Sequence, residues 1–250
     1  MFPFFTIRDD HAVIEHQKPQ RSIAAKESIM AKAKTFTVGP VVTPKGVISF
    51  PHLDKPEMEG EYASKKFVTT LLMPKTSDLT KLSNACLEAA QGQWPELKIT
   101  SLKQIKLPFR DGDEKQNMRG YPGATYIKVK TSYKPSIKSC TKLENGAFAD
   151  HETPIRGGNV CRLSVTALPW EQNLDKEVYE ALKTSGAVVI KGTDETGKVK
   201  YWRPSVTFAL DAVQFIEAGA SMGGGNNTGS AFDDGEFTVS AAVAKDDMFD

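Results

Sequence analysis

The chain has 250 residues, of which 40% are hydrophobic and 25% charged, and its formal net charge is +1. This composition is typical of soluble globular proteins, and no stretch approaches the roughly 18 apolar residues that a membrane-spanning helix needs, which argues against a membrane protein. The three cysteines, Cys86, Cys140 and Cys161, are odd in number and widely spaced, and no Cys/His cluster has metal-ligand spacing, which argues against a disulfide scaffold and a zinc site.

The first thirty residues lack the pattern of a folded element. Met1 to Phe5 is apolar but too short for a signal peptide, and no basic region precedes it. Lys26-Glu27 can be encoded by a ribosome-binding sequence, which makes Met30 a candidate for the normal start of translation. We therefore expect residues 1–30 to be a disordered or spurious extension, residues 31–220 to form one domain, and residues 221–250 to be a flexible Gly-rich linker and tail.

Strand signals dominate the first half of the expected domain. Apolar runs that alternate or are rich in β-branched residues predict strands, and apolar residues at helical spacing after Thr76 or Ser77 predict a helix that ends near Gly92 and Pro95. The strands expected in this half are 35–42, 46–50, 62–73 and 99–107.

The second half has the same character, with a turn at 110–114 and a helix at 174–183 that Gly186 closes. The strands expected there are 124–133, 160–168, 187–191, 198–202 and 205–216. Because strands and helices do not alternate regularly, the pattern predicts a mainly β fold. We expect an antiparallel β-barrel of the oligonucleotide-binding (OB) kind, with inserted loops and two short helices.

The end of the chain is strongly acidic. Residues 231–250 hold six acids and one base, a net charge of −5, so the rest of the chain carries +6. A basic body joined to an acidic tail with an aromatic tip is typical of proteins that coat single-stranded nucleic acid, in which the tail occupies the empty groove or recruits partner proteins. An ordinary disordered terminus is the alternative.

The positive charge of the body is concentrated in residues 103–138, which hold nine basic residues against three acids. Within it, alternation along the strand predicts that Ile127 and Val129 face the core while Tyr126, Lys128 and Lys130 share the opposite face. A ring in line with two ammonium groups suits single-stranded nucleic acid, because bases stack on rings and cations follow the phosphates. A solvated strand face that merely discourages aggregation is the alternative.

These features give a list of candidate DNA-binding residues and no catalytic, metal or cofactor site. The residues expected to stack on bases are Phe109, Tyr121, Tyr126 and Tyr133. The residues expected to bind phosphate are Arg110, Lys115, Arg119, Lys128, Lys130 and Lys134. Trp202 and Arg203 are added because they precede Pro204 and could lie at a strand end within reach of a groove, and Trp170 is a further candidate.

Two other classes of function stay open at this point. Asp111 and Asp113 could hold a divalent metal in a DNA-processing nuclease, although Asp-Gly pairs are ordinary turn formers and no further acids or base are evident around them. A virion or scaffold protein that assembles through its tail is the second alternative. A homodimer is also compatible with the sequence.

Four stretches resemble the single-stranded-DNA-binding proteins of tailed bacteriophages: 42–53, 107–115, 123–135 and 206–215. The resemblance implies an OB barrel that coats single-stranded DNA without strong sequence preference during phage DNA replication, recombination or repair, in the cytoplasm of an infected bacterial host. It also implies that the tail residues Asp246, Asp247, Phe249 and Asp250 bind replication or recombination proteins. The tail departs from the bacterial pattern because Asp250 follows Phe249.

Overall fold

The computed structural model describes residues 35–58, 64–194 and 196–222, which belong to one structural unit that begins at Thr35. The expectations for residues 1–30 and for the acidic tail, including Asp246, Asp247, Phe249 and Asp250, lie outside the described residues. Those expectations, and the domain boundaries drawn from them, stay predictions.

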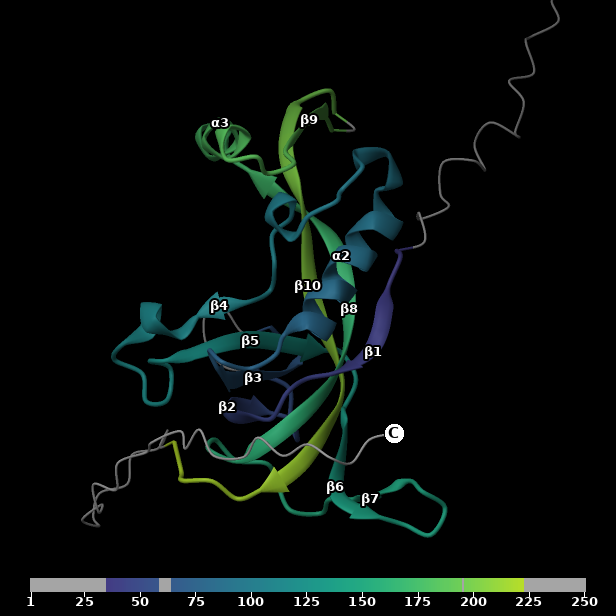
Figure 1. The fold of residues 1–250 in the computed structure, drawn as a ribbon, viewed down its shortest axis with the longest axis vertical. Coiled ribbons are helices and arrows are strands. Elements are labelled where there is room, and N and C mark those ends of the chain that lie inside the picture. The colour runs from purple at the N-terminus through teal and green to yellow at the C-terminus, as the bar shows by residue number, and fades with distance from the viewer. Residues whose placement is uncertain (1–34, 59–63, 195, 223–250) are drawn as a thin grey trace, which may run out of the picture. The chain divides into compact units, whose positions relative to one another are not determined.

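The described residues form ten strands and two α-helices (Figure 1). The strands are β1 (Val38–Val42), β2 (Gly46–His52), β3 (Phe67–Pro74), β4 (Arg110–Asp111), β5 (Ala124–Thr131), β6 (Ser136–Lys142), β7 (Phe148–Asp150), β8 (Val160–Leu174), β9 (Ile190–Thr193) and β10 (Val199–Glu217). The helices are α2 (Thr80–Gln93) and α3 (Lys176–Thr184), and short 3-10 turns occupy Pro95–Leu97, Leu102–Gln104 and Gly112–Lys115. The predicted mainly β fold with two short helices is confirmed.

Five of the strands follow one another in a closed ring of hydrogen-bonded neighbours. In this ring β2 pairs with β3, β3 with β5, β5 with β10, β10 with β8, and β8 returns to β2. The other strands extend it: β1 joins β8, β4 joins β5, β6 and β9 join β10, and β7 joins β6. The pairs are antiparallel except where β10 runs parallel to β5 and to β6, which departs from the fully antiparallel arrangement expected.

The main core lies on the inner face of this ring, and the alternation of β8 shows how the sequence builds it. Cys161, Leu163, Val165 and Ala167 are all fully buried, while the residues between them are partly exposed. Helix α2 packs on the same core through buried residues at helical spacing, which include Leu82, Cys86 and Ala89. All three cysteines are unpaired, and burial raises the pKa of the Cys86 and Cys161 thiols to about 12.

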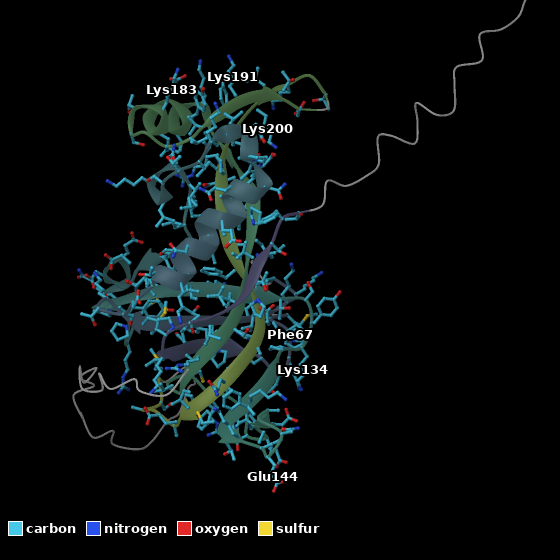
Figure 2. All side chains as sticks on the ribbon, turned by 45° about the vertical axis from the view of Figure 1, so that its right-hand side comes forward. Phe67, Lys134, Glu144, Lys183, Lys191 and Lys200 are labelled. Atoms are coloured by element: carbon cyan, nitrogen blue, oxygen red, sulfur yellow. The ribbon has the colours of Figure 1, made fainter. Side chains whose placement is uncertain are left out.

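The far ends of β8 and β10 extend beyond the ring and carry α3 and β9 (Figure 1). Tyr201 on β10 packs on Tyr179 of α3, with ring centroids 4.7 Å apart. Lys183, Lys191 and Lys200 lie together on this extension (Figure 2). None of the helices in the described part of the chain combines the length and the apolar character needed to cross a membrane.

The structure differs from the expected secondary structure in three further places. Residues 99–107 do not form one strand, because Ser101 begins a 3-10 turn: its Oγ accepts a hydrogen bond from the Lys103 amide, and Gln104 Oε1 accepts one from the Ser101 amide. The β6–β7 hairpin is absent from the expected strands, because none of the residues in its strands is buried and they lack an apolar alternation. Strand β3 also begins at Phe67 rather than at residue 62.

Candidate nucleic-acid interface

The basic segment 103–138 is centred on β5, which lies between β3 and β10 in the ring. Ile127 and Val129 are fully buried, and Lys128 and Lys130 are exposed, as the alternation predicts. Because Lys128 and Lys130 alternate with these core residues, both lysines project from the outer face of the ring, where they pair across the sheet with Thr70 and Val68.

The chain continues from β5 into an exposed turn that adds a ring and a third charge. The Tyr133 side chain is 83% exposed, and Lys134 beside it is exposed as well. Phe67, which pairs with Thr131, and Lys134 lie at the same end of the β3–β5 pair (Figure 2). We call Lys128, Lys130, Tyr133 and Lys134 the β5 strip. Lys128, Lys130 and Lys134 make no ion pair with any residue that the structure describes.

The expectation of an open Tyr126 ring beside Lys128 is wrong. Tyr126 is only 3% exposed and Tyr121 only 2%, because the loop after β4 folds over this part of the outer face. Their rings meet edge to face with centroids 5.1 Å apart and pack with Leu72 and Ala124 in a second, smaller apolar cluster. Neither ring is open for stacking on a base in this structure.

The Lys115 side chain packs on the two tyrosine rings of this cluster. Its Nζ lies 4.9 Å from the centroid of the Tyr121 ring and 4.9 Å from that of Tyr126, within the range of cation–π attraction. The Lys115 charge is therefore held at the edge of the loop by the two rings that were expected to bind bases.

The loop is fixed by a shared ion pair and a close backbone contact. Lys75 Nζ lies 2.8 Å from Asp111 Oδ1 and 2.5 Å from Asp113 Oδ2, and Asp113 Oδ1 accepts a 2.7 Å hydrogen bond from the Gly123 amide. A side chain at Gly112 would have its Cβ 2.0 Å from the Tyr121 carbonyl oxygen, so only glycine fits there.

These contacts stabilise the charged forms of both carboxylates. The hydrogen bond from Lys75 is the main cause of the lowered pKa of Asp111, and the Gly123 amide is the main cause of the lowered pKa of Asp113. The part of the chain that the structure describes contains no group of three or more His, Cys, Asp or Glu residues placed to hold a metal. Asp111 and Asp113 hold the loop in place through their contacts with Lys75 and, for Asp113, with the Gly123 amide.

The other candidates are divided between the surface and the core. Arg110 and Arg119 are exposed, and Arg119 donates a 3.3 Å hydrogen bond to the carbonyl of Ser221. Phe109 is half-buried and packs on Phe208 with ring centroids 6.0 Å apart, so its ring belongs to the core side.

Trp202 and Arg203 lie on opposite faces of β10. Trp202 packs against the main core and against Trp94, with ring centroids 5.8 Å apart, which is a structural placement rather than an open platform. Arg203 is partly exposed on the other face of β10 and donates a 2.8 Å hydrogen bond from Nε to Gln172 Oε1. Of the aromatic candidates, Tyr133 is the most exposed, and Trp170, on β8, is 44% exposed.

Burial of Tyr126 predicts that its loss acts on stability. Tyr126→Ala should lower the free energy of unfolding by about 3 kcal/mol, since truncation of a buried aromatic ring removes its packing and leaves a cavity. Urea denaturation followed by circular dichroism measures the change. Tyr133→Ala is the matched control, and it should change the free energy of unfolding by no more than about 0.5 kcal/mol because its ring is exposed. Equal stability of Tyr126→Ala and the unaltered chain would contradict this packing.

No curated protein sequence matches the chain, but solved structures resemble it. The single-stranded DNA-binding protein from bacteriophage Enc34, solved in complex with ssDNA, is 18% identical, and the match covers 76% of this chain and 91% of that one with a TM-score of 0.45. For gp2.5, a single-stranded DNA-binding protein encoded by bacteriophage T7, the identity is 13%, the coverage 74% and 90%, and the TM-score 0.38.

The family model described as the ssDNA-binding protein of Enterobacter phage Enc34 matches residues 39–200, which is more than half of the chain. The match begins within β1, extends through β9 and covers the whole basic segment. It agrees with the resemblance to phage proteins found in the sequence. The chain therefore belongs to the Enc34 family of single-stranded-DNA-binding proteins.

Proposed function

We propose that this member of a single-stranded-DNA-binding family coats single-stranded DNA without sequence preference and carries out no chemistry on it. The β5 strip is the observation that carries the proposal. It combines three lysines that lack an ion pair with the described residues, on β5 and in the turn that follows it, with the widely exposed ring of Tyr133 in the same turn. By contrast, Lys138, only four residues further, is neutralised by Asp150 at 2.6 Å.

The chemistry of the strip suits a single strand better than a duplex. Ammonium groups follow the phosphates of either form, but an exposed ring can stack only on bases that are not already paired and stacked. Lysine binds phosphate as a point charge and every base has a π-face, so contacts of this kind give affinity with little sequence readout. Arg110 and Arg119 lie exposed on the adjoining loop and extend the cationic surface.

We further propose that the ring of β2, β3, β5, β10 and β8 is an OB barrel. In that fold the second and third strands and the loops after the first and fourth strands bind oligonucleotides. Counted from β2, the second and third strands are β3 and β5, which places the β5 strip on the binding face. The loop after the fourth strand then corresponds to the segment with α3 and β9.

A nuclease centred on Asp111 and Asp113 is the less favoured alternative. Both carboxylates are engaged by Lys75, and Asp113 also accepts the Gly123 amide, so their arrangement is accounted for by the loop they hold. A virion or scaffold protein is disfavoured because the family description names DNA binding.

We also propose that the acidic tail binds replication or recombination proteins through Asp246, Asp247, Phe249 and Asp250, and that it competes with DNA for the basic surface. The point where the described chain ends supports competition. Ser221 accepts the hydrogen bond from Arg119, and the Met222 amide donates a 3.3 Å hydrogen bond to the Gly157 carbonyl, so the described chain ends beside the basic loop. The site of action would be the cytoplasm of an infected bacterial host.

The first test is fluorescence anisotropy of a labelled thymidine oligonucleotide and of a matched duplex over a salt series. We expect tight binding of the single strand, weaker binding of the duplex and a steep decrease of affinity with salt. Incubation of the same oligonucleotide with Mg²⁺ should leave it intact. Cleavage would favour the nuclease, and absence of binding at low salt would favour a scaffold protein.

The strip itself is tested by the double variant Lys128→Gln, Lys130→Gln. We expect several-fold weaker binding at low salt, and a log–log salt slope that becomes shallower by about 0.7 for each phosphate of a single strand that the variant no longer neutralises. The matched control is Lys138→Gln, since that lysine is already neutralised by Asp150. If the control and the double variant have the same slope as the unaltered chain, the strip does not bind phosphate.

Deletion of residues 231–250 tests the tail. The deletion removes a net charge of −5 from the chain, so a competing anion is lost and single-stranded DNA should bind more tightly, with the largest gain at low salt. Anisotropy of the truncated and full-length chains, measured side by side, gives the difference. Unchanged or weaker binding would mean that the tail serves protein partners alone.

A further inference from the structure

Lys106, Ser205 on β10 and Trp170 on β8 lie side by side on the outer face of the long β8–β10 pair. The Lys106 amide donates to the Pro204 carbonyl and the Val206 amide donates to the Lys106 carbonyl, both at 3.0 Å, so Lys106 lies beside Ser205. On the other side Ser205 is paired with Trp170. Residues paired across a sheet present their side chains to the same face, so Lys106 and Trp170 flank Ser205 on one face.

This face is the one turned away from the core. Val206 and Phe208 on β10 and Pro169 on β8 are buried, and the side chains next to them in the chain point the opposite way. Trp170 is 44% exposed there, and Ser205, as the small residue between two large side chains, is covered. Arg203 lies on the same face, one row further along, where its Nε is held by Gln172.

Lys106 and Arg203 give this part of the face a positive charge that no acid of the described residues pairs with. Lys106 and Arg203 make no ion pair with the residues in the described ranges, whereas the nearby Lys200 is paired with Glu171 at 2.6 Å. Partial burial, followed by the charges of Arg203 and Arg110, lowers the pKa of Lys106, so these cations are close enough to repel one another. A bound anion would relieve that repulsion.

We propose that Trp170, Lys106 and Arg203 form a nucleotide subsite of the DNA-binding surface, in which the indole stacks on a base and the two cations bind the adjacent phosphates. This inference rests on the proposed coating function and adds a stacking residue that lies on a different pair of strands from the β5 strip. An indole next to unpaired cations on a sheet face is the combination that binds single strands.

Segment 106–111 links the subsite to the first surface. Lys106 joins β10 at one end, and Arg110 on β4 is paired with Tyr126 of β5 at the other. Leu107 and Phe109, which lie between them, pack against the main core. Burial, then the charge of Arg203 and then that of Arg110 lower the pKa of Lys106, so Lys106 and Arg110 are close to each other. A strand of DNA bound along β5 therefore has a path of cations across Arg110 and Lys106 to Trp170.

Tryptophan fluorescence of the full chain tests the proposal, because the chain has three tryptophans and Trp94 and Trp202 pack against the core. A thymidine oligonucleotide of about 30 nucleotides, longer than the usual OB-fold site of about 4–16, is titrated into the protein. We expect quenching in the unaltered chain. Trp170→Phe should lose this quenching while retaining most of the affinity.

Affinity is measured by anisotropy on the same oligonucleotide. Trp170→Ala should bind about five- to a hundredfold more weakly, the range expected for loss of one stacked base, and Trp170→Leu should not restore binding. Leu143→Ala, which removes an exposed apolar side chain from the β6–β7 hairpin, should have no effect. Lys106→Gln and Arg203→Gln should each make the salt slope shallower by about 0.7.

Several outcomes would overturn the subsite. If the unaltered chain binds DNA but quenching persists in Trp170→Phe, or Trp170→Ala retains full affinity, the subsite is wrong and the coating function stands. Full affinity in Trp170→Leu would show apolar packing in place of stacking. If the unaltered chain fails to bind, both the coating function and the subsite fall. The quenching of Trp170→Phe decides the matter even where Trp170→Ala does not fold.

Discussion

The antiparallel pairing of β8 with β10 is the constraint on which the rest of the structure depends. It runs from Tyr201 opposite Leu174 to Glu217 opposite Val160, and β10 also pairs with β5, β6 and β9. The β8–β10 pair closes the ring of strands, and its end beyond the ring supports α3 and β9. Its inner face supplies much of the main core, so its outer face is a rigid surface on which charged and aromatic side chains can be held in place.

Packing separates the rings of the basic segment from its charges. Tyr121 and Tyr126 gain more from burial on each other and on Leu72 than from exposure on a strand, since a buried aromatic ring contributes about 1.5–3 kcal/mol. Lysine ammonium groups cannot be buried without a partner, so Lys128 and Lys130 stay in solvent. Tyr121 and Tyr126 are thus structural rings beside exposed cations, and stacking must come from other rings, such as Tyr133, which is 83% exposed, and Trp170, which is 44% exposed.

The sequence predicted what local patterns determine. The alternation of β5 correctly placed Ile127, Val129, Lys128 and Lys130, because period-two spacing alone decides which face each residue joins. It could not show that a loop covers Tyr126, since that depends on Lys75 reaching Asp111 and Asp113 from β3's end, 36 and 38 positions away. At the level of sequence, Lys106 is only one charge of the basic segment. The sequence could not predict that Lys106 lies close to Arg203, because the two residues are nearly a hundred positions apart in the chain.

Local charge matters more for this function than net charge. A net charge of +1 would give little general attraction to DNA, but the −5 of the final twenty residues leaves a body of +6, concentrated on few elements. At physiological ionic strength charges separated by more than about 8 Å are largely screened, so phosphates respond to the nearest cations and not to the total. Cations that form no ion pair with a described residue, as at Lys128, Lys130, Lys106 and Arg203, therefore define where a strand is held, whereas Lys75, Lys138 and Lys200 are already neutralised within the fold.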